Sequence, residues 1–184
     1  SPAHLDHHGG FPWLAGRGWI GRLCENGSDP RGSWRRSLAR GSSHPGSVVF
    51  PLCADTLLGW GNGATIRVLA AERRLPADPN YNAGENNRSL VATLRTGRGA
   101  ICFAGDVEAD AERALLGQLE PVLVVKVPHH GSGTSSEAAW IDALAPRVAI
   151  ISCGEGNRFG HPDRARWAAI SSGASASSGP MRKG

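Results

Sequence analysis

The sequence lacks any long apolar run and has few cysteines. No apolar stretch approaches the roughly 18 residues that cross a bilayer, and no basic-then-apolar leader is visible, so we expect a soluble segment. The four cysteines form no CxxC pair, which argues against a zinc finger or a disulfide framework. With 40% apolar and 20% charged residues, the composition is typical of a globular domain.

Lysine is also scarce. Lys126 and Lys183 are the only two, so arginine carries almost all of the positive charge behind the formal net charge of +4. A guanidinium group pairs bidentately with phosphate, and an excess of arginine therefore fits contact with nucleic acid. A GC-rich genome would produce the same excess, and no dense basic run decides between the two interpretations.

Hydrophobic patterning predicts an α/β layered domain over residues 1–170. Residues 11–46 have weak periodicity and are expected to form short helices and loops. Residues 171–184, rich in serine, alanine and glycine, are expected to form a disordered tail. Strands are predicted at 47–52, 64–70, 89–96, 99–106, 121–128 and 147–154, with GWGNG (59–63) as a turn between the first two. Helices are predicted at 108–119, at 135–145 and after 161, the second of them capped by Ser135 or Ser136.

Four polar clusters interrupt this pattern, and three of them lie at the end of a predicted strand. Because the carboxyl ends of strands in open α/β sheets meet at one edge, residues far apart in sequence can form one site there. The clusters are His4-Leu5-Asp6-His7-His8, Asn86-Asn87-Arg88-Ser89, Gly105-Asp106, and His129-His130 with His161-Pro162.

Two of these clusters favour metal binding. The spacing of His4, Asp6 and His7 offers nitrogen and oxygen ligands from one turn, a combination that suits zinc, manganese or iron better than calcium. Asp106 follows an apolar strand, where an uncompensated carboxylate is costly to bury and a cation would remove the cost. One carboxylate can also bridge two metals, which together clamp a phosphoester.

Each cluster has a simpler alternative. The first histidines can be an exposed polar terminus or the remnant of a tag. Asp106 can be the N-cap of the helix that follows it. His129-His130 can be a solvated pair, and the asparagines and His161 can be turn residues. The joint occurrence of all four clusters is far less expected by chance than any one of them.

The order of these motifs resembles a known family. From Asn86 to Pro162 the chain reads NNRSLV, AGDVEADAERALL, VLVVKVPHHGSGTSS and PRVAIISCGEGNRFGHP. This series resembles the metallo-β-lactamase-fold domain of the ComEC-type DNA-internalisation (competence) proteins. SPAHLDHHGG resembles the HxHxDHxGG signature of the wider superfamily, with Pro2 where the first histidine is expected.

The resemblance implies an αββα sandwich that is incomplete, because strands expected before the HxHxDH signature are missing and the C-terminal part is atypical. It also implies two divalent transition-metal ions, zinc or manganese, with Asp106 as the bridging ligand. The implied metal ligands are His4, Asp6, His7, Asp106, His129 and His161. The resemblance does not decide which of the later histidines binds metal and which donates a proton.

The implied chemistry is hydrolysis of a DNA phosphodiester bond during DNA uptake. Besides Asp106, the expected catalytic residues are His129 or His130, which would protonate the leaving oxygen, and Asn87. Contacts with the substrate are expected from Asn86, Asn87, Ser89, Ser132 and Arg158.

Two alternatives stay open at this stage. One is an inactive remnant, or a DNA-contacting module of a larger membrane competence protein. The other is a metal-dependent hydrolase of a small ester or lactone, since one fold hosts many chemistries. DNA is the expected partner, with a membrane channel and other competence proteins as further partners of a parent chain. In the family that parent is an inner-membrane protein.

Overall fold

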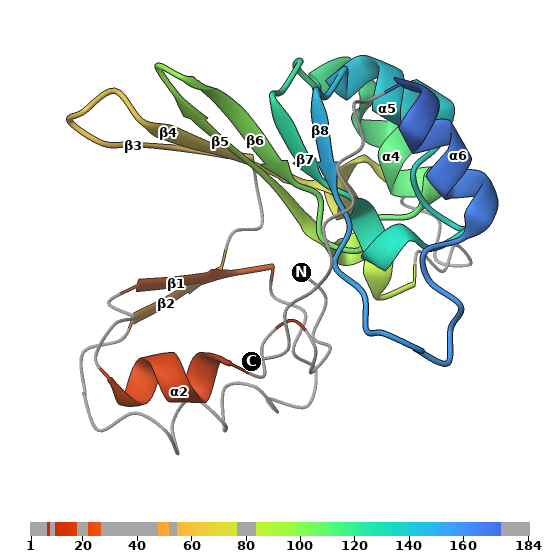
Figure 1. Cartoon of the computed structure of the whole chain (residues 1–184). Coiled ribbons are helices and arrows are strands. Elements are labelled where there is room, and N and C mark those ends of the chain that lie inside the picture. The colour runs from red at the N-terminus through yellow and green to blue at the C-terminus, as the bar shows by residue number, and fades with distance from the viewer. Residues whose placement is uncertain are drawn as a thin grey trace.

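A computed structural model describes residues 7, 10–17, 22–26, 48–51, 55–76 and 84–173. Its main element is a six-stranded sheet in which the strands follow one another in sequence order, β3 to β8 (Figure 1). The strands are β3 (Thr56–Gly59), β4 (Thr65–Ala70), β5 (Leu90–Thr96), β6 (Gly99–Phe103), β7 (Val124–Lys126) and β8 (Val148–Ile150). The fold is thus mixed α/β, in agreement with the sequence prediction.

The pairing of the strands changes from antiparallel to parallel at β6. The strands from β3 to β6 pair antiparallel, whereas β6, β7 and β8 pair parallel. The parallel strands are connected through helices α4 (Ala109–Leu115) and α5 (Ala138–Leu144), and α6 (Arg164–Gly173) follows β8. The C-terminal ends of β6, β7 and β8 therefore lie at one edge of the sheet, which confirms the prediction that the motifs after them converge.

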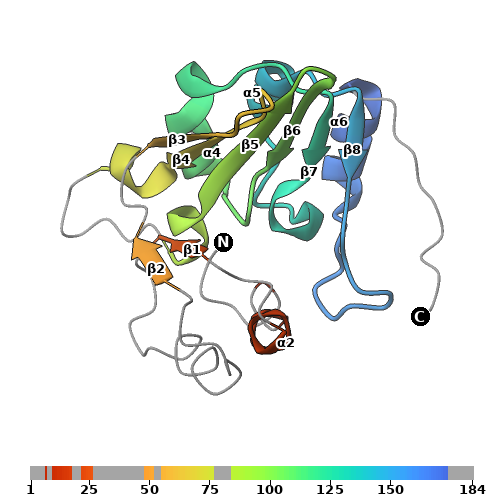
Figure 2. The same ribbon diagram turned by 90° about the vertical axis from the view of Figure 1, so that its left-hand side faces the viewer.

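The three helices cover one face of the sheet (Figure 2). Cys102, Val125 and Ala149 are aligned across β6, β7 and β8, and each is at most 5% exposed. They belong to one hydrophobic core with residues of the helices, including Leu115, Trp140 and Ile170. The next residues along the strands point to the opposite face, because side chains alternate along a strand.

That opposite face is apolar and partly exposed. Phe103, Lys126 and Ile150 are aligned across the same three strands, and Phe103 and Ile150 are about half exposed, at 48% and 51%. No described helix covers this face (Figure 2). A smaller two-stranded parallel sheet of β1 (Arg22–Glu25) and β2 (Val48–Pro51) lies to one side, together with α2 (Phe11–Gly16) (Figure 1).

The sequence prediction missed two strands near the N-terminus, β1 and β3. The predicted strand at 47–52 exists as β2, but its partner is β1, which was not predicted. The strand that precedes the turn at GWGNG and pairs with β4 is β3. Its central residues Leu57 and Leu58 are exposed, so it lacks the apolar–polar alternation that marks a half-buried strand.

Two helix ends also differ from the prediction. Neither Ser135 nor Ser136 caps α5; the N-cap residue is Glu137, and the buried carboxylate of Glu112 accepts hydrogen bonds from the backbone N–H groups of Ser136 and Glu137. Helix α6 continues to Gly173, beyond the predicted start of a disordered tail at Ser171. The Ser171 hydroxyl donates a hydrogen bond to the Trp167 carbonyl one turn earlier, which lets a serine remain helical. Residues 174–184 lie outside the described residues.

Within the described residues, no helix is long and apolar enough to cross a membrane.

Candidate metal centre

Asp106 is fixed at the end of β6 by a tight backbone approach. Gly105 has φ +61°, and a Cβ there would lie 2.9 Å from Cβ of Ser89, so the position requires glycine. The backbone N–H of Asp106 donates a 3.1 Å hydrogen bond to Oγ of Ser89. The Asp106 side chain is 2% exposed. Asp106 does not cap α4, because the N-cap residue of that helix is Glu108. The alternative interpretation of Asp106 as a helix cap is therefore wrong.

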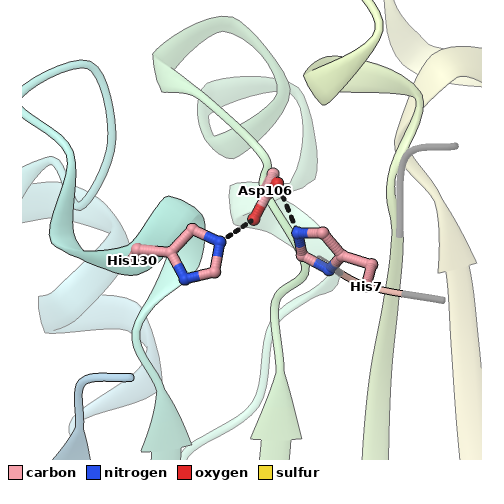
Figure 3. Close-up of side chains that lie close together, drawn as sticks. All are labelled: His7, Asp106 and His130. Carbon is pink, nitrogen blue, oxygen red and sulfur yellow. Dashed lines mark ion pairs between the residues drawn. The ribbon is translucent and has the colours of Figure 1, made fainter. Parts of the chain in front are cut away.

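Two histidines face the buried carboxylate from opposite sides (Figure 3). His7 Nε2 lies 2.7 Å from Asp106 Oδ2, and His130 Nε2 lies 3.8 Å from Asp106 Oδ1. One ligand atom from each of the three residues lies within 4.8 Å of the other two. Among the histidine, cysteine and acidic side chains of the described residues, these three form a group with the spacing of a metal site.

The orientation of His130 turns its Nε2 toward Asp106. Its Nδ1 lies 2.7 Å from the carbonyl oxygen of Ser152, which can only accept a hydrogen bond. Nδ1 therefore carries the proton, and in the neutral ring Nε2 is unprotonated. A metal-binding histidine typically donates its second N–H to a carbonyl or carboxylate in this way.

The histidines also keep Asp106 ionised. Burial by itself raises the pKa of Asp106, but a hydrogen bond from His7 and the charges of His7, His129 and His130 outweigh burial. Together they hold the pKa of Asp106 below its usual value. The carboxylate is thus available as an anionic ligand near neutral pH.

The two adjacent histidines lie in a strained turn. His129 and His130 have φ of 45° and 55°, and Gly131 continues the left-handed conformation at 81°. Left-handed backbone costs about 1–2 kcal/mol for a residue with a side chain, and such strain is concentrated at functional sites. The turn is tied to the Asp106 loop by a 3.0 Å hydrogen bond from the His129 N–H to the Gly105 carbonyl.

Because the two histidines point differently, they have different partners. His129 Nδ1 lies 3.3 Å from Oε1 of Glu108, whereas His130 faces Asp106. The same Glu108 oxygen accepts hydrogen bonds from the Thr134 hydroxyl and from Nδ2 of Asn86. Sequence reasoning missed Glu108, although its position two residues after Asp106 on the same loop is a signal that could have found it.

The predicted substrate-binding residues mostly support this loop. Ser89 is fully buried against the Asp106 N–H, and Asn87, which is 4% exposed, accepts a hydrogen bond from the Glu108 N–H. Ser132 is 6% exposed, and its hydroxyl lies 3.0 Å from the Thr134 hydroxyl. Contact of these residues with a substrate stays a prediction, because in this structure they position Asp106, Glu108 and Thr134.

His161 and Arg158 lie further out. The His161 ring is 5.8 Å from that of His129, and burial and then the charges of His129 and His130 lower the pKa of His161. His161 is not part of the three-residue group at Asp106, and Arg158 is exposed on the preceding loop. The predicted ligands His4 and Asp6, and Pro2, lie outside the described residues.

An open pocket of about 300 Å³ adjoins the Glu108 side of the site. Its walls are formed by Asn87, Glu108, Ala109, Asp110, Thr134 and Arg166. The guanidinium Nε of Arg166 donates a hydrogen bond to the Gly133 carbonyl, which holds α6 against the histidine loop. The pocket thus offers acidic, hydroxyl and guanidinium groups beside His129.

The chain is similar to parts of several longer proteins. It is 39% identical over 82 residues to ComE operon protein 3 of Bacillus subtilis (strain 168), an alignment that covers 44% of this chain and 11% of that protein. It is 33% identical over 116 residues to competence protein ComA of Neisseria gonorrhoeae, covering 61% of this chain and 16% of that protein. These similarities support a relationship of this chain to the ComEC-type competence family.

A third relative extends the same pattern. Recombination protein 2 of Haemophilus influenzae (strain ATCC 51907 / DSM 11121 / KW20 / Rd) is 35% identical over 78 residues, which cover 42% of this chain and 10% of that protein. No family model matches the chain. The alignments with these three relatives span between 10% and 16% of the relatives' own length. The resemblance inferred from the motifs is confirmed at the level of the family.

Proposed function

We propose that this chain is a metal-dependent hydrolase that cleaves DNA phosphodiester bonds as part of DNA uptake. The observation that carries the proposal is the buried Asp106 carboxylate placed between the imidazoles of His7 and His130. The names of the homologues, which include competence and recombination proteins, favour DNA as the substrate class. The net charge of +4 favours a polyanionic partner as well.

The side chains present fit a divalent transition ion. Two imidazole nitrogens and a carboxylate form a donor set that zinc and manganese accept. Oδ1 of Asp106 is buried and has no hydrogen-bond donor among the described residues, and an ion would satisfy it. A divalent ion held by His7, Asp106 and His130 would supply Lewis-acid chemistry, which polarises a phosphoryl oxygen and lowers the pKa of water. A second ion, which Asp106 would also help to hold, belongs to the same proposal.

Of the remaining residues of the site, one would donate a proton and the others hold its side chain in position. Glu108 fixes His129 through Nδ1, so His129 is the residue that would protonate the leaving oxygen. Asn86 and Thr134 hold the Glu108 carboxylate in turn. In the proposed enzyme, His130 is therefore a metal ligand and His129 the proton donor, which assigns roles that the sequence left open.

We further propose that the domain, spanning residues 1–170, is a metallo-β-lactamase-like αββα sandwich. The exposed apolar residues Phe103 and Ile150 support this, because a second sheet packed on that face would bury them. As part of a parent competence protein, the domain would act at the inner membrane beside the channel and other competence proteins.

The test compares the protein with one site variant and one matched control. Asp106→Asn keeps the size of the side chain but removes its charge; Asp142→Asn makes the same change at an exposed position of α5. We expect the wild type and Asp142→Asn to retain zinc or manganese and to release nucleotides from labelled DNA. Asp106→Asn should lose bound metal and about 10- to 100-fold or more in cleavage rate.

Other outcomes separate the alternatives. Equal cleavage by Asp106→Asn and the wild type would refute the assignment of the site. Hydrolysis of a small ester or lactone but not of DNA would favour the small-molecule hydrolase. A wild type that binds DNA but is inactive with every metal would favour a DNA-contacting module.

A further inference from the structure

The loop between β8 and α6 presents an aromatic side chain on a rigid backbone. Asn157 anchors this loop: its Nδ2 donates to the carbonyls of Gly154 and His161, and its Oδ1 accepts from the N–H groups of Phe159 and His161. Phe159 itself is 67% exposed. Because the backbone N–H groups of Phe159 and His161 are bonded to one side chain, the backbone that carries the exposed ring is fixed beside the site.

Phe159 lies at the end of a row of rings that begins at the metal centre. Its ring is stacked on that of His161 at 5.8 Å with an interplanar angle of 17°. His161 in turn is 5.8 Å from His129, and His129 is 6.4 Å from His130, which faces Asp106. The exposed ring thus belongs to the same surface as the proposed proton donor.

A cation accompanies the ring. The guanidinium carbon of Arg158 lies 4.9 Å from the centre of the Phe159 ring, and Arg158 is exposed. A scattered exposed apolar residue needs no explanation. Here the aromatic residue lies on a hydrogen-bonded loop, its ring is stacked on that of His161, and an arginine accompanies it. Proteins that bind single-stranded nucleic acid combine aromatic rings and arginines in this way. Successive bases stack on aromatic side chains while guanidinium groups stack on bases or contact phosphates.

We propose that Phe159 is a stacking platform for a nucleobase of a single strand, and that Arg158 contacts the adjoining phosphate. The proposal rests on the proposed function for its choice of ligand, and it names the form of nucleic acid that the site accepts. A base within a duplex has both faces covered by its neighbours, so it cannot lie on Phe159. The contact is tolerant of sequence, because every base has a π face.

The test measures binding in the absence of metal, so that it is independent of cleavage. The probe is an end-labelled oligothymidine of roughly 12 nucleotides, a length within the site sizes of single-strand binding proteins, titrated with the full chain in EDTA and followed by fluorescence anisotropy. Phe159→Ala should weaken binding by about 5- to 150-fold, the effect of losing one base–aromatic stack. Phe159→Trp should bind at least as well as the wild type.

Three controls make the assignment specific. Trp60→Ala removes another exposed aromatic residue, next to β3, and should leave the affinity unchanged. An oligonucleotide of abasic sites should bind weakly to the wild type and be insensitive to Phe159→Ala. A blunt hairpin duplex should be insensitive as well, and an oligouridine of the same length distinguishes DNA from RNA.

The proposal is overturned if the wild type does not bind the single strand. It is also overturned if the dissociation constant of Phe159→Ala lies within twofold of that of the wild type, a difference of about 0.4 kcal/mol in binding free energy. It is also overturned if abasic and thymidine probes bind equally. These outcomes are distinct from failure of the proposed hydrolase. If the protein cleaves DNA but its binding does not depend on Phe159, only the proposal of a stacking platform is refuted. If the protein binds DNA through Phe159 but does not cleave it, only the proposal of a hydrolase is refuted.

Discussion

Glu112 gives the structure a pH dependence that can be isolated by one substitution. Its carboxylate is fully buried in α4 and accepts hydrogen bonds of 2.6 and 2.8 Å from the N–H groups of Ser136 and Glu137. Burial raises the pKa of Glu112 to about 7, although the two hydrogen bonds oppose the shift. In the unfolded chain the pKa is 4.5. The folded state therefore binds this proton more tightly than the unfolded state.

The sign and size of the effect follow from linkage. Because the pKa is raised on folding, the stabilisation from protonated Glu112 is fully present below pH 4.5 and is lost as the pH rises through about 7. A difference of about 2.5 pKa units corresponds to about 3 kcal/mol, an upper value for a buried group. Glu112→Gln places a neutral amide there that does not titrate, and it leaves one of the two N–H groups without an acceptor.

The assay is urea unfolding of wild type and Glu112→Gln between about pH 5 and pH 8, the range that spans the shifted pKa. At the acid end the variant should be less stable by about 1–3 kcal/mol, the cost of an unsatisfied buried group. As the pH rises, the wild type should lose stability relative to the variant, and the difference between their free energies of unfolding should change by up to about 3 kcal/mol in favour of the variant. The exposed control Glu155→Gln should parallel the wild type. If the curves of Glu112→Gln and wild type are parallel, the reasoning is wrong.

The remaining predictions concern the histidine turn. At His129, with φ 45°, glycine should be more stable than alanine by about 1 kcal/mol in thermal unfolding, the reverse of the usual order, because only glycine relieves the left-handed strain. Equal stability of the two variants would contradict the prediction, because it would mean that the backbone at this position leaves the left-handed conformation without cost. Gly131→Ala should destabilise the fold by about 1–3 kcal/mol, because its Cβ would lie 2.8 Å from Cβ of Pro162 at φ +81°. Gly133→Ala, whose Cβ meets nothing closer than 3.5 Å, is its control and should be nearly neutral.

The sequence indicated where polar residues would gather, although their role as a metal site stays a prediction. The implied ligand set named His129, whereas in the structure His130 is the histidine of that loop that groups with His7 and Asp106. Asp106 and His130 each follow a short apolar strand, and parallel strands bring such residues to one edge whatever the details of the helices. His7 was found because its motif places ligands at fixed spacing. The alternation that identifies a strand depends on one buried and one solvated face, and β3, with Leu57 and Leu58 exposed, lacks it.

Contacts supplied from elsewhere in the chain could not be read from local pattern. Ser135 and Ser136 are good caps by residue type, yet the Ser135 hydroxyl donates to the Val107 carbonyl, and a carboxylate from α4 takes over the cap. The partner of His130 is a backbone carbonyl, that of Ser152, and a carbonyl has no signature in a sequence. The difference between His129 and His130 therefore became visible only in the structure.

The same contacts explain how two strained histidines can be held in place. The segment that begins at Gly105 and the segment that begins at Pro128 are joined by His129 N–H to Gly105, by Ala109 N–H to Thr134, and by the two bonds of Glu112. Strain of a few kcal/mol persists only where the surrounding bonds over-determine the backbone. The Asp106 carboxylate and the His130 ring are thus parts of one hydrogen-bonded unit, preorganised before any ion arrives. His7, which comes from far earlier in the chain, meets this unit at the Asp106 carboxylate, so the ion that we propose would join the two parts of the molecule.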